Sequence, residues 1–231
     1  MKTAAILQSN YIPWKGYFDL IHDVDEFIFY DEVQYTVRDW RNRNLIKNRE
    51  GLKWLTIPVG SDYHRKIKEV ELPNNLWQNK HLDLLTYCYS KTPFFNKYRD
   101  LLDYIYTENK WTNLSELNQT VIKMISKEIL GIKTEFSNSE KYPSEKRRSE
   151  KLIEILLAAG ANTYISGPAA KRYIDEDLFR NNNIELIWKD YDGYPEYPQL
   201  YAPFEHNVTI LDLLFYTGND AAWYIWGWRQ G

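Results

Sequence analysis

Residues 31–44 combine side chains that bind anions with side chains that stack on rings. Their sequence, DEVQYTVRDWRNRN, contains three arginines, three carboxylates, two asparagines, one glutamine and two large aromatic residues. The planar guanidinium group of arginine matches phosphate or carboxylate and also stacks on aromatic faces. We therefore predict that Arg38, Arg43 and Asn44 hold an anionic substrate and that Trp40 covers its ring or sugar. The alternative is a surface loop whose charges pair with one another.

Residues 8–17, QSNYIPWKGY, follow a short apolar run and form a second candidate segment. A helix that begins after a buried strand presents free backbone N–H groups and the positive end of its dipole, which together attract anions. Glycine at position 16 lets a ligand or a neighbouring backbone approach closely. The substrate-binding candidates here are Gln8, Tyr11, Trp14, Gly16 and Tyr17. An ordinary turn with Trp14 and Tyr17 packed inward would explain the same residues.

Residues 166–171, SGPAAK, form a turn of small residues that leads into a short predicted helix. Ser166, Gly167 and Lys171 are substrate-binding candidates, since backbone amides and a lysine can contact phosphate or carboxylate. The spacing differs from the GxxxxGK[ST] pattern of a P-loop, so a Walker-type ATPase is not supported. A simple tight turn is the alternative.

Candidates for proton transfer are few. Asp31 ends a predicted buried strand among arginines, and His64 follows a strand-like run, so each is a candidate general base. The four histidines show neither HExxH nor another tight metal-binding spacing, and we predict no metal. Cys88 is the single cysteine and no GxSxG elbow exists, which argues against a nucleophile-type hydrolase.

The pattern of apolar residues predicts the elements that must position these groups. A buried strand at 3–9, a helix over 16–21 and a strand at 27–30 form a βαβ unit, which is typical of a parallel sheet. Functional groups in such sheets gather beyond the carboxyl ends of the strands. Residues 8–11 and 31–35 both follow such ends, so we expect the loops after the first two strands to converge on one pocket.

The rest of the chain continues this α/β pattern around a helical section. We predict two strands within 44–59, a half-buried strand at 67–72, helices near 76–90, 94–107 and 114–130, and a mobile connection at 137–150. A helix over 152–160, strands at 163–166 and 184–188, and a helix at 208–216 follow. The predicted fold class is α/β, with a parallel-rich sheet, flanking helices and a Rossmann-like topology. We expect one domain over residues 1–231, with 74–131 as a helical insertion or cap.

Composition excludes several functional classes. The chain has 231 residues, a net charge of −3 and 29 basic against 32 acidic side chains, which gives no support to nonspecific nucleic-acid binding. No run approaches the roughly 18 apolar residues of a membrane-spanning helix, and the first residues turn polar too soon for a secretory signal. We expect a soluble cytoplasmic protein. Aromatic residues make up 16% of the chain, and they suit core edges as well as sites that stack on sugars.

Several of these residues together resemble the WbqC-like family. The matching features are QxxYxPxxGYFxxI from Gln8 to Ile21, then Asp25, DxVQ at Asp31–Gln34, and Arg43-Asn44. The similarity spans nearly the whole chain, because further matches occur at Trp54 to Val59, Tyr164-x-Ser166-Gly167, Phe204 and residues 210–215. The positions to which the family pattern carries over are Gln8, Tyr11, Gly16, Asp31, Gln34, Arg43, Asn44 and Asp212. The first strand and helix also resemble the layout of HIGH-type nucleotidyltransferases, although Trp14 and Tyr17 replace both histidines of that motif.

The resemblance implies a role in the biosynthesis of surface polysaccharides such as the O-antigen of lipopolysaccharide. Proteins of this kind are associated with transfer of an acyl or aminoacyl group to an amino sugar. Such chemistry needs a base, donors to the oxyanion and contacts for a diphosphate. Asp31 or His64 would be the base, Gln34 and Asn44 the oxyanion donors, and Arg38 and Arg43 the diphosphate contacts.

The leading hypothesis is therefore an acyl or aminoacyl transferase, and two alternatives stay open. One is a nucleotide-dependent ligase or nucleotidyltransferase-like enzyme, and the other is a noncatalytic sugar-binding assembly protein. We expect no cofactor, with a nucleotide or an acyl donor serving as substrate. The expected partners are a nucleotide-linked amino sugar, an acyl or aminoacyl donor and, as a further candidate, a carrier protein. No nucleic acid is expected as a partner.

Overall fold

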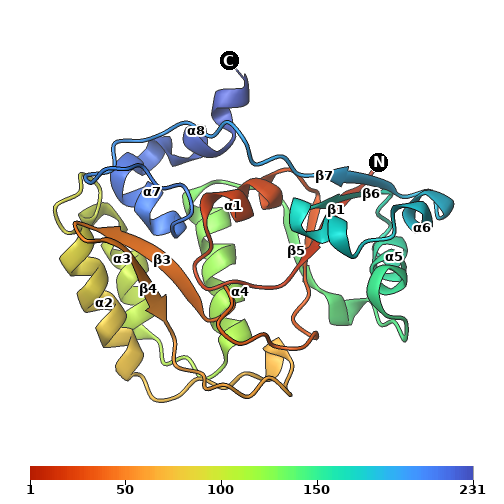
Figure 1. Cartoon of the computed structure of the whole chain (residues 1–231), viewed down its shortest axis with the longest axis horizontal. Helices are drawn as coiled ribbons and strands as arrows, with labels where there is room; N and C mark the ends of the chain where they lie inside the picture. Colours follow the sequence, from red (N-terminus) through yellow and green to blue (C-terminus); the bar gives the residue numbers. More distant parts are fainter. Residues whose placement is uncertain (231) are drawn as a thin grey trace.

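A five-stranded parallel sheet organises the protein, as the computed structural model shows for residues 1–230 (Figure 1). Its strands lie in the order β5-β2-β1-β6-β7, and every neighbouring pair is parallel. This sheet confirms the predicted α/β class with a Rossmann-like topology. The strands are β1 (Thr3–Leu7), β2 (Glu26–Phe29), β5 (Glu135–Asn138), β6 (Thr163–Ser166) and β7 (Glu185–Trp188).

Helices connect the parallel strands, as parallel pairing requires a crossover on one face of the sheet. Helix α1 (Lys15–His22) joins β1 to β2, α5 (Arg148–Ala158) lies between β5 and β6, and α6 (Glu176–Asn181) lies between β6 and β7. A short 3₁₀ helix, Pro168–Arg172, follows β6. Within residues 1–230, no helix is both long enough and apolar enough to cross a membrane.

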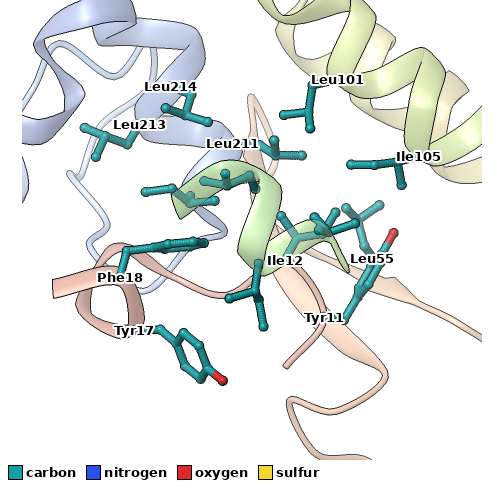
Figure 2. Packing of buried hydrophobic residues seen from close by; sticks show 14 of the residues in the cluster. Tyr11, Ile12, Tyr17, Phe18, Leu55, Leu101, Ile105, Leu211, Leu213 and Leu214 are labelled. Carbon is teal, nitrogen blue, oxygen red and sulfur yellow. The ribbon is translucent and has the colours of Figure 1, made fainter. Parts of the chain in front are cut away.

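The three central strands, β1, β2 and β6, are buried on both faces and separate two apolar cores. Ala5 and Phe27 face the larger core, which also contains buried residues of α1, α4 (Leu114–Met124) and α7 (Ile210–Thr217). Ala4 and Ile28 face the second core, which α5 and α6 cover. Side chains alternate between the two faces along each strand, which explains this division. Figure 2 shows part of the larger core, where Phe18, Leu55 and Leu211 come from three different elements.

A β-hairpin and further helices form the side of the molecule away from β6 and β7 (Figure 1). The hairpin pairs β3 (Arg43–Asn48) with β4 (Gly51–Thr56), as the sequence predicted. The helices there are α2 (Leu76–Tyr89), α3 (Arg99–Asp103) and α4, and α8 (Ala221–Ile225) follows α7. Both α3 and α4 continue as π-helical turns, over Tyr104–Glu108 and Ile125–Ile129.

Two predicted elements differ from the structure. Residues 67–72 form a 3₁₀ turn, Ile67–Glu69, and a single bridge from Glu71 to Asn113 instead of a strand. Their alternating apolar residues arise because Ile67 and Val70 both enter the core from this turn. The segment 137–150, expected to be a mobile connection, begins with the end of strand β5, whose residues pair with β2 at the edge of the sheet.

The order of connections reverses between β1 and β6. The chain passes from β1 to β2, which lies on one side of β1, and β5 extends the sheet further on that side. Strands β6 and β7 then lie on the other side, with β6 paired directly to β1. In open parallel sheets, such a reversal leaves a cavity outside the carboxyl ends of the strands, and ligands bind there.

Candidate functional site

A cavity of about 770 Å³ lies at this reversal, and we call it the crevice. Residues from the carboxyl ends of β1, β2 and β6 line it, together with the start of α5 and the segment before α6. Its volume falls within the range that binds small-molecule ligands. The polar residues of its lining are Gln8, Tyr30, Arg148, Ser149, Tyr164, Ser166, Arg172, Tyr173 and Asp175.

Two exposed arginines give the crevice its positive charge. Arg148 is the first residue of α5, and it adopts a positive φ of 52°, a conformation that L-residues rarely adopt. Arg172 ends the 3₁₀ helix after β6, and its Nε donates to Ala169 O at 3.2 Å. Helix α5 begins without a side-chain cap, so its first N–H groups add positive potential beside Arg148. The arrangement suits an anion.

A carboxylate faces the same cavity. Asp175 caps α6 by accepting a hydrogen bond from Leu178 N at 3.2 Å through Oδ1. Its own N–H donates to Ser149 Oγ at 3.1 Å, which ties α6 to the first turn of α5. The crevice therefore carries two arginines and one carboxylate among its described lining residues.

A second cavity of about 250 Å³ is lined in part by Asn10, which lies two residues after Gln8 in the loop that follows β1, and we call it the neutral cavity. All six of its lining residues are uncharged: Asn10, Pro13, Trp14, Trp40, Asn44 and Asn207. Two indole rings and three carboxamides therefore surround the space. Trp40 is 41% exposed, so part of its ring is open to a ligand.

Hydrogen bonds fix the loop beneath the neutral cavity in an unusual conformation. Ile12 is fully buried with a φ of 38°, which is a strained value for a β-branched residue. Its carbonyl accepts hydrogen bonds from Asn44 Nδ2 at 2.8 Å and Thr209 Oγ1 at 2.7 Å. Asn44 Nδ2 also donates to Tyr11 O at 3.1 Å. The strain persists because these buried donors determine the position of the loop.

Arg41 links the two cavities, although the sequence analysis did not single it out. One of its terminal nitrogens donates to Asn10 Oδ1 in the neutral cavity, and the other donates to Gln8 Oε1 in the crevice at 3.3 Å. Asp39 lies 3.4 Å from the same guanidinium. The only feature of the sequence that pointed to Arg41 was its position in the arginine-rich segment 31–44. Nothing in that segment distinguishes Arg41 from Arg38 and Arg43.

Asp31, the first candidate base, is buried and contributes to the architecture of the strand ends. It accepts hydrogen bonds from Ser9 N at 2.8 Å, Gln119 Nε2 at 3.1 Å and the hydroxyl of Ser115. These contacts join the loop after β1 to α4. Asp31 lines a separate cavity of about 270 Å³ beside Ser115.

The structure also separates the other polar candidates, Arg43, Gln34 and His64, from one another. The Arg43 guanidinium lies 4.1 Å from the centre of the Trp54 ring and donates to the carbonyl of Arg38. Gln34 is exposed, and its Nε2 donates to Tyr63 O at 3.0 Å. His64 is exposed in the loop after β4, where its ring packs 4.1 Å from Tyr63. The loops after the first two strands therefore do not bring Asp31, Gln34 and Arg43 into the crevice lining.

The remaining substrate-binding candidates divide between cavities and core. Gln8, Ser166 and Gly167 line the crevice, and Trp14, Trp40 and Asn44 line the neutral cavity. Tyr17 donates to Gln8 O at 2.9 Å. Gly16 lies against Trp14, since a Cβ at this position would come within 2.2 Å of the indole. Lys171 packs 5.6 Å from the Trp188 ring, and its neighbour Arg172 lines the crevice instead.

Tyr11 belongs to a buried polar network. Its hydroxyl contacts His81 Nδ1 at 2.8 Å and Tyr106 Oη at 2.7 Å, while His81 Nε2 lies 3.2 Å from Thr56 O. Burial lowers the pKa of His81 to about 4, because a charged imidazole would lose its hydration there. The network therefore holds a neutral histidine beneath the loop of the neutral cavity.

Lys15 is a second buried base near this loop. It is 2% exposed, and its ammonium lies 4.8 Å and 5.4 Å from the ring centres of Tyr194 and Tyr197. Among residues 1–230, no group is hydrogen-bonded to its Nζ. Burial lowers its pKa to about 8, with Asp212 acting in the opposite direction. Asp212 itself accepts hydrogen bonds from Tyr89 and Tyr197, and burial raises its pKa.

One group of side chains has the composition of a metal site. Ligand atoms of Asp19, His22 and Asp23 lie within 4.8 Å of one another. Lys189 contacts both carboxylates, at 3.0 Å and 2.5 Å, and Arg229 donates to Asp19 at 2.6 Å. These cations already neutralise the carboxylates, so the geometry favours an ion-pair network at this position.

Comparison with known proteins places the chain in a family. The model of the WbqC-like protein family matches residues 8–224, and the chain therefore belongs to this family. It is 47% identical over 232 residues to uncharacterized protein Rv1507c of Mycobacterium tuberculosis (strain ATCC 25618 / H37Rv), and the match covers 100% of both chains. No solved structure gives a significant match.

Proposed function

We propose that the protein is a transferase that binds a phosphorylated or nucleotide-linked amino sugar in the crevice and acylates or aminoacylates its amine. The supporting observation is the position of Arg148 and Arg172 in a 770 Å³ cavity at the reversal of strand order. Guanidinium groups bind phosphate oxygens through charge-assisted hydrogen bonds. The role in surface polysaccharide assembly follows from what the WbqC-like resemblance implies.

The proposed reaction forms a bond between the amine nitrogen of the sugar and the carbonyl carbon of an acyl thioester. The bond from that carbon to the thiol sulfur breaks, and the thiolate leaves with its electron pair. Asp175 accepts the proton that the nitrogen loses, because its carboxylate faces the crevice. Gln8 Nε2 donates to the oxyanion that develops on the carbonyl oxygen.

Equilibrium binding tests the anion site. We expect UDP-glucosamine to raise the melting temperature of the protein, since a ligand that binds only the folded state stabilises it. Arg172→Ala and Arg148→Ala should each weaken the affinity for UDP-glucosamine, measured by calorimetry, about tenfold. This loss corresponds to one charge-assisted hydrogen bond. Lys171→Ala and Arg180→Ala are matched controls, since both are exposed cations outside the crevice lining. Unchanged affinity in both crevice variants would refute the proposed site.

Turnover tests the proposed chemistry. Mass spectrometry should detect acylated UDP-glucosamine when the protein is supplied with acyl-CoA, and Asp175→Asn should lower kcat at least 100-fold. The asparagine oxygen can still cap α6, so the melting temperature should stay within about 2 °C. Binding without product would instead favour the noncatalytic sugar-binding alternative. Stabilisation by ATP with a divalent metal, and by no nucleotide sugar, would favour the ligase alternative.

A further inference from the structure

The crevice and the neutral cavity share the short loop that follows β1. Gln8 lines the crevice and Asn10 lines the neutral cavity, and Arg41 donates to both side chains. Two residues of fully extended chain span at most about 7 Å. A single small molecule with one anionic end and one neutral end is therefore long enough to occupy both cavities.

The chemistry of the neutral cavity suits one sugar ring. Its volume of about 250 Å³ is smaller than that of a typical site for drug-sized ligands. The indoles of Trp14 and Trp40 offer apolar surface to the C–H face of a sugar. Carboxamides both donate and accept hydrogen bonds, as sugar hydroxyl groups do. Asn44 already bonds to the backbone, so Asn10 Nδ2 and the Asn207 carboxamide are the groups assigned to the ligand.

The strained loop beneath the cavity gives a second reason to expect a ligand. Ile12 keeps its positive φ because Asn44 and Thr209 hold its carbonyl, and Tyr11 N donates to Trp40 O at 2.9 Å. Ile210 N donates to Pro13 O at 2.9 Å. Strain that the surrounding structure enforces is concentrated at binding and catalytic sites. Side chains held in this way need little reorganisation to bind a ring.

We propose that the neutral cavity binds the sugar ring of a glycosyl phosphate whose anionic end lies in the crevice, with Arg41 between the two. The amino group, on the carbon next to the one that carries the phosphate, then faces the crevice, where Asp175 and Gln8 lie. The inference rests on the proposed function, since it identifies which part of the substrate each cavity takes. Trp40 and Asn207 contact the ring, while Arg148 and Arg172 contact the phosphate. Arg41 positions Gln8 and Asn10, which line the two cavities.

Calorimetry on the full chain tests this division with two ligands that share only an anionic group. N-acetylglucosamine 1-phosphate has the sugar without a base, and UDP has the base without the amino sugar. Trp40→Ala should weaken binding of the sugar phosphate about tenfold and Asn207→Ala about fivefold, with UDP affinity unchanged within twofold. Trp223→Ala is the matched control, because Trp223 is 50% exposed on α8 and lies outside the neutral-cavity lining. Arg172→Ala should weaken both ligands.

Two results would overturn the assignment of the neutral cavity. One is wild-type affinity for the sugar phosphate in both Trp40→Ala and Asn207→Ala. The other is an equal loss of UDP affinity in these variants, which would place the base in the cavity. Methyl N-acetylglucosaminide, which has no phosphate, separates this inference from the proposed function. Its saturation-transfer NMR signal should disappear in Trp40→Ala even if no phosphate ligand binds the crevice, and a signal that persists would contradict the assignment.

Discussion

The crevice and the neutral cavity are neighbours, but their walls are built in different ways. The crevice carries exposed charged side chains at the start of α5 and before α6, above the second core. The neutral cavity is lined by uncharged side chains, and buried hydrogen bonds from Asn44 and Thr209 fix its loop above the larger core. Exposed charges attract an anion over a distance, whereas a pre-formed wall selects a shape. Under the proposed function, the crevice would therefore capture the substrate and the neutral cavity would select it.

The largest expected effect concerns the neutral cavity alone. The buried His81 in the network beneath its loop should make the protein lose stability in acid. The pKa of His81 is about 4 in the folded protein against 6.5 for the free side chain, so the unfolded chain takes up the proton first. Stability is therefore complete above pH 6.5 and falls by about 3 kcal/mol as the pH decreases to 4. Urea unfolding of wild type and His81→Gln at pH 7 and pH 4.5 measures this contribution.

The His81→Gln variant should be less stable than wild type at pH 7 but should lose less stability on acidification. His64→Gln is the matched control for the loss of one imidazole, because His64 is exposed in a loop. An identical acid-induced loss in wild type and His81→Gln would contradict the lowered pKa of His81 and show that other groups cause the loss.

A somewhat smaller effect is expected at Lys15. Its pKa is about 8 when folded and 10.5 when exposed, so folding disfavours the charged amine at neutral pH. Lys15→Met should therefore raise the free energy of unfolding at pH 7 by about 2 kcal/mol. Wild-type stability should rise between pH 8 and 10.5, since the unfolded chain holds the proton longer, and the variant should lack this rise. Lower stability of Lys15→Met at pH 7 would mean that contact with Tyr194 and Tyr197 outweighs the cost of burial.

The smallest predicted effect is the most selective for one cavity. Gly16→Ala places a methyl group within 2.2 Å of the Trp14 indole, which must move and reshape the neutral cavity. Affinity for N-acetylglucosamine 1-phosphate should fall about fivefold while UDP affinity stays unchanged. Titration of both ligands into the same preparation provides the internal control. Equal losses for both ligands would mean that the two cavities respond as one unit.

Four of the five parallel strands could be predicted because their residues are apolar in short, nearly continuous runs. Strand β5 was missed because Glu135, Ser137 and Asn138 are polar and only half-buried or exposed, and pairing with β2 at the edge of the sheet makes it a strand. The opposite error occurred at residues 67–72, where Ile67 and Val70 alternate with polar residues but enter the core from a 3₁₀ turn. Local pattern therefore predicts the strands with apolar residues, including β7 at the opposite edge, but misses a polar segment that becomes a strand only through pairing.

Some residues of the candidate site could be predicted from the sequence, and others could not. Gln8, Ser166 and Gly167 line the crevice because residues at the carboxyl ends of neighbouring parallel strands meet at one edge. Arg38 and Arg43 were predicted to bind the anion, but Arg43 stacks on Trp54 and bonds to the Arg38 carbonyl. Arg148 and Arg172, which line the crevice, lay in segments interpreted as a mobile connection and as the short helix after the turn at 166–171. Side-chain type alone does not show which of several arginines finds a local partner.

The sequence by itself determined the α/β class, the family and the strand ends near which we propose that a ligand binds, because buried runs and the residues that terminate them are local properties. The tertiary structure alone decided that Asp31 supports the loop after β1, that Arg41 spans two cavities, and that one cavity is charged and the other neutral. These outcomes depend on contacts between residues far apart in the chain. Such contacts depend on how α4, α5 and the segment before α7 pack around the sheet, which no short stretch of sequence specifies.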